Sequence, residues 1–227
     1  MSEAPSTSAA AARPPRATAG VLVWEWPLRL WHWLFAGCIS GSLYTGLSED
    51  ISLLTWHMRF GYCVLGLLMF RLLWAIWGGR HARFSAYATS PGRILAYFRG
   101  EPATGAHTPP GSALILIMWL LVTMQVLAGL FASDEIFTEG PLARYGSDEW
   151  VELMTGAHHR IFWLIIAAIF VHLSAHAVYA LRRDPTPLSM FTGRKPASVP
   201  PTDQRWIAAL LTALVAVALV WSGLELV

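Results

Sequence analysis

Charged residues are scarce in this chain. Only 13% of its 227 residues are Asp, Glu, Lys or Arg and 55% are hydrophobic, which is unusual for a soluble domain. Cysteine is rarer still. Cys38 and Cys63 do not form a Cys-x-x-Cys-His arrangement, so covalent c-type haem attachment is excluded. We interpret both as small buried side chains.

The first 20 residues also lack an apolar segment. They consist mainly of Ala, Pro, Ser and Arg without periodicity. A cleaved signal peptide is the competing interpretation, and the missing apolar stretch argues against it. We expect residues 1–20 to form a disordered cytoplasmic tail.

Hydrophobic residues are concentrated in five blocks, at 28–47, 58–77, 112–132, 157–181 and 206–224. Each is close to the roughly 20 residues that an α-helix needs to cross a bilayer. Helices are favoured because lipid offers no partner to exposed backbone groups. The predicted fold is an all-α integral membrane protein, with a four-helix transmembrane domain over 21–195. A linker and a fifth transmembrane helix follow over 196–227, and this helix is expected to be a lipid-facing anchor or a partner contact.

Charge is segregated among the connecting loops. The acidic residues lie mainly after the first and third blocks, including Glu49, Asp50 and the segment 134–152. The loops after the second and fourth blocks are basic, with Arg80, Arg83, Arg93, Arg99, Arg182, Arg183, Arg194, Lys195 and Arg205. The positive-inside rule then predicts an inner-membrane protein with a cytoplasmic N-terminus and a periplasmic C-terminus.

Histidine within a membrane helix is costly and calls for a functional reason. Of the eight histidines, His81 and His107 fall in a polar loop, where solvation accounts for them. His158 and His172 are 14 residues apart, which corresponds to about 21 Å along a helix and a rotation of about 40°. One helix face therefore presents two imidazoles at two depths, which suits two stacked redox centres better than one metal ion.

Two other histidines of this segment compete with that pair. His159 projects about 140° away from His172, so it does not share the face. His176 lies on the face of His158 but about 27 Å along the axis, close to the cytoplasmic end. Geometry favours His172, and His176 remains an alternative.

A haem confined to electron transfer needs two axial ligands. His57 begins the second block as His158 begins the fourth, so both are expected near the outer face. His32 begins the first block near the cytoplasmic face, at the depth closest to His172. The sequence therefore predicts two haem b groups, one held by His57 and His158 and the other by His32 and His172.

Arg71 follows His57 by 14 residues, the spacing that also separates His158 from His172. It is therefore expected to lie level with the inner haem, where a propionate would supply the anion that a buried arginine needs. Arg29, one turn before His32, is a second candidate for a propionate. The competing interpretation is an arginine that extends to the cytoplasmic interface.

Tryptophans and glycines give weaker signals. An interfacial aromatic belt is the expected role of the tryptophans near predicted helix ends, namely Trp24, Trp26, Trp31, Trp33, Trp56, Trp74 and Trp77. Close approach of a backbone or of a flat macrocycle is expected at Gly41, Gly46, Gly61, Gly66 and Gly129, although helix contacts would require the same residues.

The chain resembles the prokaryotic cytochrome b561 family, which includes cytochrome b subunits of nickel–iron hydrogenases. The resemblance rests on Val-Trp-Glu-Trp-Pro-Leu-Arg-Leu-Trp-His-Trp at 23–33, His-Met-Arg-Phe-Gly-Tyr at 57–62, and Thr-Gly-Ala-His at 155–158. Phe-Arg-Leu-Leu-Trp at 70–74, the run 80–84 and Phe-Thr-Gly-Arg-Lys at 191–195 add to it. It implies a four-helix core that binds two haem b groups through His32, His57, His158 and His172. Two features depart from the pattern. His159 stands beside a ligand, which leaves an exchange of roles with His158 open, and the fifth helix exceeds the four-helix core.

The leading functional hypothesis is electron transfer between an outer-face partner and the quinone pool. The partner would be a cytochrome c or a dehydrogenase or hydrogenase subunit, and the quinone could bind at either face. The resemblance also implies an alternative, a superoxide:quinone oxidoreductase that acts at the outer haem with Arg59, Arg160 and His159 attracting the anion. No carboxylate lies within a predicted helix interior, which argues against a metal transporter. Lipid is an expected partner and nucleic acid is not.

Overall fold

The computed structural model describes residues 20–225 except 104, 137 and 196–198, so the predicted tail lies almost wholly outside the described residues. Helices make up most of the described part. The long helices are α1 (Trp26–Gly46), α2 (Leu54–Trp77), α4 (Pro109–Phe131), α5 (Asp148–Leu181) and α7 (Trp206–Glu225). The short elements are the helices α3 (Pro91–Phe98) and α6 (Thr186–Thr192), the 3-10 turns η1 (Ile51–Leu53), η2 (Phe84–Tyr87) and η3 (Ala143–Tyr145), and the strands β1 (Val21–Leu22) and β2 (Arg194–Lys195).

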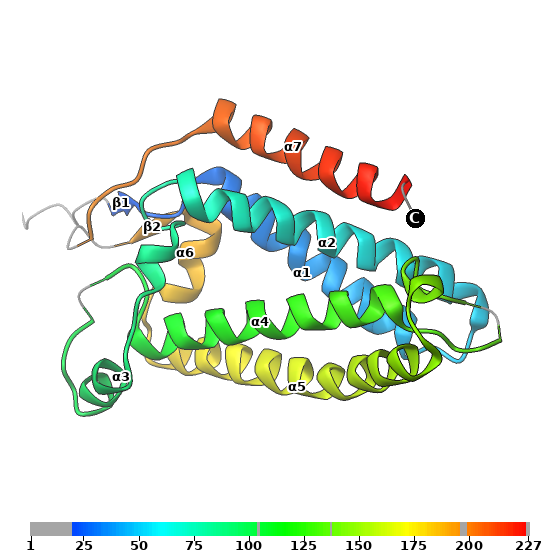
Figure 1. Ribbon diagram of the computed structural model, residues 1–227. Coiled ribbons are helices and arrows are strands. Elements are labelled where there is room, and N and C mark those ends of the chain that lie inside the picture. The colour runs from blue at the N-terminus through cyan, green and yellow to red at the C-terminus, as the bar shows by residue number, and fades with distance from the viewer. Residues whose placement is uncertain (1–19, 104, 137, 196–198, 226–227) are drawn as a thin grey trace, which may run out of the picture.

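Four of the long helices form two antiparallel hairpins that lie along each other (Figure 1). One hairpin consists of α1 and α2 and the other of α4 and α5, and packing within each is more extensive than between them. Where the hairpins meet, Val64 and Leu68 of α2 pack with Val122 of α4 and with Ile161 and Ile165 of α5. This apolar core therefore joins the two hairpins through α2, α4 and α5.

Four of these helices are long and apolar enough to cross a membrane: α2 extended by η1, α4, α5 and α7. The chain is thus an all-helical membrane protein with four candidate spans. Helix α1 does not belong to this set, because Arg29, His32 and several Ser and Gly residues dilute its apolar content. Four of the five predicted membrane spans are therefore supported as candidates. That α1 also crosses the membrane stays a prediction.

The predicted helix boundaries lie within four residues of those in the structure, except at the start of α5. This helix begins at Asp148, nine residues before the start of the apolar block. Ser147 caps it by accepting a hydrogen bond from the Trp150 amide (3.3 Å), and Asp148 and Glu149 occupy the first turn, where acidic groups favour helix formation. The hydrophobic pattern could not reveal this polar extension.

One end of the bundle is closed by chain segments that are distant in sequence. β1 pairs antiparallel with β2, so that Val21 lies opposite Lys195. The amides of Val23 and Trp24 donate to the Gly193 carbonyl at 2.8 and 3.0 Å. We call this end, which also includes the loop 78–108 and the segment 199–205, the loop end. These backbone contacts hold the start of α1 in a fixed position.

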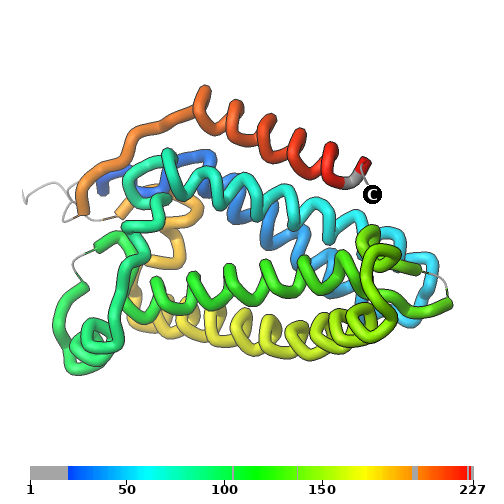
Figure 2. The backbone as a smooth tube through the Cα atoms, in the orientation of Figure 1, coloured from blue at the N-terminus to red at the C-terminus, as the bar shows by residue number. Residues whose placement is uncertain are grey.

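Helix α7 lies along α2 on the side away from α4 and α5 (Figure 2). Ala209, Thr212 and Ala216 are its buried residues against the bundle. Trp77 donates its indole N–H to Thr212 Oγ1 (2.9 Å), which fixes the register of the contact. The helix therefore combines a packed face with an apolar exposed face.

Candidate cofactor-binding site

His57 and His158 face each other across the two hairpins. Their ring centres are 6.0 Å apart and the ring planes are nearly perpendicular, at 84°. Two metal–imidazole bonds of about 2.0 Å in line would put the bonding nitrogens about 4 Å apart, with the ring centres somewhat farther. The pair therefore has a separation that suits two axial ligands on one metal.

Hydrogen bonds define the tautomer of both rings. His57 Nδ1 lies 2.9 Å from the Ser42 carbonyl of α1, and His158 Nδ1 lies 3.0 Å from the Gln125 carbonyl of α4. A carbonyl oxygen can only accept a hydrogen bond, so each Nδ1 must carry the proton. The Nε2 atom of each neutral ring then has a free lone pair. Metal-binding histidines are typically oriented in this way.

A glycine makes each of these contacts possible. Gly46 and Gly129 stand four residues, or one helical turn, after the carbonyls of Ser42 and Gln125. A Cβ at Gly46 would lie 2.7 Å from His57 Nδ1, and one at Gly129 would lie 2.9 Å from the ring of His158. Because Gly46 and Gly129 lack a Cβ, the two imidazole rings can pack against the helix backbone at these positions.

The other glycines singled out by the sequence behave differently. A Cβ at Gly41 would meet the Phe60 ring at 2.6 Å, whereas Gly61 and Gly66 have nothing within 4 Å of such an atom. Close approach is therefore a property of Gly41, Gly46 and Gly129 alone among these five.

A second histidine cluster is formed by His32, His172 and His176. The rings of His172 and His176 are 4.6 Å apart, and His32 lies within electrostatic reach of both. His32 Nδ1 is enclosed and has no hydrogen-bond partner among the described residues. The structure thus brings His32 close to both histidines that the sequence weighed as its partner.

Arg71 is completely buried, at 1% exposure. One terminal nitrogen, Nη2, donates to the Ala82 carbonyl (2.9 Å) and to Tyr87 Oη (2.7 Å). Nε and Nη1 are enclosed without a partner in the described part of the chain, and no carboxylate there forms an ion pair with Arg71. The guanidinium lies 4.2 Å from the Trp119 ring centre and 5.5 Å from that of Trp31, which neighbours His32.

Such a buried cation with two free donors fits an anionic ligand. The burial of Arg71 within the protein argues against the interpretation as an interfacial arginine. Arg29 is different. Its donors reach the Met190 carbonyl (3.2 Å) and the Phe191 carbonyl at the end of α6, and it lies over the Trp26 ring. These contacts account for Arg29 without a ligand, and its propionate role stays a prediction.

The structure corrects the expectation for two histidines of the loop end, His81 and His107. Solvation does not account for His81 and His107. His81 is buried and donates to the Pro200 carbonyl (2.7 Å), and His107 packs between Trp24 and Tyr87 with ring distances of 4.7 and 4.5 Å. Burial lowers the pKa of His107 to about 3, so the ring is neutral at physiological pH.

The aromatic belt was also predicted too broadly. Trp24, Trp31 and Trp74 are buried within the protein, where they pack together in one core cluster. The other four tryptophans considered are exposed or nearly so at helix ends, as a belt requires, namely Trp26, Trp33, Trp56 and Trp77.

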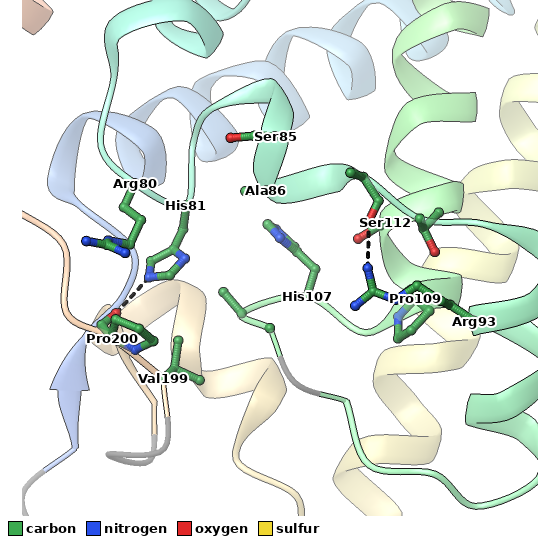
Figure 3. A pocket seen from close by; sticks show the side chains of 14 residues that line it. Arg80, His81, Ser85, Ala86, Arg93, His107, Pro109, Ser112, Val199 and Pro200 are labelled. Atoms are coloured by element: carbon green, nitrogen blue, oxygen red, sulfur yellow. Dashed lines mark hydrogen bonds between the residues drawn. The ribbon is translucent and has the colours of Figure 1, made fainter.

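A polar cavity of about 360 Å³ opens at the loop end (Figure 3). Arg80, His81, Thr89, Arg93 and His107 are among its lining residues. Thr89 Oγ1 and His107 Nδ1 are enclosed and lack a hydrogen-bond partner within the described ranges. The Thr89 hydroxyl and the His107 ring nitrogen therefore remain available to hydrogen-bond a small polar ligand in this cavity.

The donor set fits haem better than a metal ion bound by protein alone. Among the described residues, no group of three or more His, Cys, Asp or Glu side chains comes together as a metal site would require. The facing imidazoles of His57 and His158 instead suit the axial ligands of a haem, and the free donors of Arg71, at the other end of α2, would suit a haem propionate.

Helices of membrane-spanning length, with paired histidines between them, define a membrane cytochrome of the b type. The match to the prokaryotic cytochrome b561 family covers residues 23–193, and the chain belongs to this family. Membership implies electron transfer through haem. No curated protein and no solved structure matches the chain.

Proposed function

We propose that this protein is a di-haem cytochrome that carries electrons across the inner membrane. His57 and His158 hold one haem b near the outer face, and His32 and His172 hold the second near the inner face. The observation that carries the proposal is the facing pair His57–His158, with both Nδ1 atoms bonded to backbone carbonyls and both Nε2 atoms free for iron. When bound, each haem supplies an iron that exchanges one electron.

The proposal of a second haem is supported by Arg71 and by the inner histidines. The free Nε and Nη1 donors of Arg71 would bind a propionate, and the enclosed, unpaired His32 Nδ1 is consistent with a ligand that completes this region. His158 and His172 lie on one helix about 21 Å apart along its axis. In the proposed protein α1 crosses the membrane with the other helices, and residues 21–195 form the haem-binding domain.

The expected partners are a quinone and an outer-face protein. The basic loops support a cytoplasmic loop end, and the cavity lined by Arg80 and His107 supports a quinone position there rather than at the outer face. The outer-face partner would be a cytochrome c or a dehydrogenase or hydrogenase subunit. The acidic segment 134–152 would favour a partner with a basic surface.

A transfer assay in vesicles tests the proposal. The protein would be reconstituted with ferricyanide trapped inside and a membrane-impermeant reductant outside. Trapped ferricyanide should be reduced in vesicles with the wild-type protein and with His159→Ala, but not with His172→Ala, which lacks an inner ligand. Equal rates for His172→Ala and wild type, or no transfer by wild-type protein that contains haem, would contradict the proposal.

The alternative function is a superoxide:quinone oxidoreductase that acts at the outer haem. The observation in its favour is a group of exposed basic side chains close in sequence to the outer pair: Arg59, His159 and Arg160. The positive electrostatic field of these basic side chains would attract a small anion. Faster loss of superoxide with purified protein and quinone, reduced by Arg59→Gln and strongly dependent on salt, would favour this function over the first.

A further inference from the structure

Glu25 is a buried acid at the start of α1. Its side chain is 1% exposed, although it directly precedes the first residue of the helix. Oε1 accepts hydrogen bonds from Trp74 Nε1 (2.6 Å) and from the Gly79 amide (3.0 Å). Oε2 is enclosed and has no partner in the described part of the chain. One carboxyl oxygen is thus held in place and the other is left to carry or release a proton.

The charges around Glu25 act only from a distance. No basic side chain among the described residues forms an ion pair with it. Arg205, before α7, and Arg71, on α2, are the cations that favour its ionised form, and the phenol of Tyr87 also lies within electrostatic reach. Burial outweighs these influences and raises the pKa of Glu25 above its usual value.

A route to water lies directly behind the free oxygen. A Cβ at Gly79 would overlap Glu25 Oε2 and would lie 2.6 Å from Thr202 Oγ1, so all three groups meet at this point. The Thr202 hydroxyl is itself enclosed without a partner among the residues described. Gly79 and Thr202 also line a cavity of about 530 Å³, together with Asp203 and Arg205. This cavity is polar and large enough for water.

Arg71 links Glu25 to the inner haem position. Its two free donors have no hydrogen-bond acceptor among the described residues, and its charge interacts with that of Glu25. A guanidinium does not release its proton in proteins, and burial raises the pKa of Tyr87, which keeps that phenol neutral. Glu25 is therefore the group of this cluster that can change its charge.

We propose that Glu25 takes up one proton from the cavity behind Gly79 and Thr202 whenever one electron arrives at the inner haem, and returns it when the electron leaves. The electron comes from the redox partner or the outer haem of the proposed function, on which this inference rests, and the proton comes from water. The added electron makes the haem more negative by one charge. Protonation of Glu25 removes one negative charge, so the net charge of the loop end stays constant. In a low-dielectric interior this compensation favours coupled uptake.

Redox titration at several pH values tests the inference. In wild-type protein, one of the two midpoint potentials should fall with pH by up to about 59 mV per unit, the value for one proton coupled to one electron. Glu25→Gln should remove this dependence at that haem. Asp203→Asn is the matched control, because Asp203 lines the same cavity but is exposed, and it should keep the dependence.

Two results would overturn the inference: wild-type potentials that do not change with pH, or a Glu25→Gln variant whose pH dependence equals that of Asp203→Asn. Infrared difference spectra of wild-type protein give an independent measurement if Glu25→Gln does not fold. A carboxylic acid C=O band should appear on reduction, and its absence would also overturn the inference. Failure of the proposed function would be visible beforehand, as a haem content of one or none per chain.

Discussion

Replacement of Gly46 by Ala should weaken binding of the outer haem while leaving the fold intact. The new Cβ would lie 2.7 Å from His57 Nδ1, whereas ordinary van der Waals contact begins near 3.4 Å. The imidazole must therefore retreat by about 0.7 Å, which would stretch its 2.9 Å contact with the Ser42 carbonyl beyond hydrogen-bond range.

Loss of that bond leaves a buried N–H without a partner, at a cost of about 1–3 kcal/mol. Loss of such an orienting contact typically reduces metal affinity by about 10- to 100-fold, which corresponds to about 1.4–2.8 kcal/mol and agrees with this cost. The intrinsic helix propensity of Ala exceeds that of Gly by up to about 1 kcal/mol, so helix formation itself should not suffer.

Gly37→Ala is the matched control. Gly37 lies on the same helix, and a Cβ there meets nothing within 4 Å. Titration of the apoprotein with haem, followed by absorbance, should give two equivalents of tight binding for Gly37→Ala. For Gly46→Ala, one of the two sites should be weakened 10- to 100-fold. Equal affinities at both sites in the two variants would refute the proposed role of Gly46 in orienting His57.

Five further variants test the remaining assignments. His158→Ala should lose the outer haem, whereas His159→Ala should retain both, as measured by haem per chain; the reverse would exchange their roles. His176→Ala should keep two haems while His172→Ala loses one, and a loss confined to His176→Ala would identify that residue as the ligand instead. Because the pKa of His107 falls from 6.5 to about 3 on folding, the unfolded state binds more protons between these values and stability should fall as pH decreases through that window. His107→Gln should reduce the acid sensitivity of the melting temperature, and an unchanged pH profile would contradict the burial of a neutral ring.

Much of this arrangement follows from one-dimensional reasoning. Apolar blocks predict the long helices, because the length needed to cross a bilayer leaves few alternatives. Equal depth on parallel helices predicts that His57 and His158 meet, and the structure places their rings 6.0 Å apart. Spacing along α2 likewise singles out Arg71, which proves to be buried with unpaired donors.

Features that depend on contacts between distant segments could not be predicted. The pairing of His57 with the Ser42 carbonyl depends on the register between α1 and α2, which hydrophobicity does not specify. Gly46 was recognised as a close-approach residue, but its partner was not. Glu25 is buried because the distant segments around residues 79 and 202 close over it, a contact that no sequence pattern specifies.

The number of haem groups bound by each chain tests the central proposal most directly. A pyridine haemochrome assay on purified protein, combined with a protein determination, should give two non-covalent b-type haems per polypeptide. Both should be extractable with acidified organic solvent, because neither cysteine lies in a haem-attachment arrangement. A content of one haem, or of none, would contradict the two-site account.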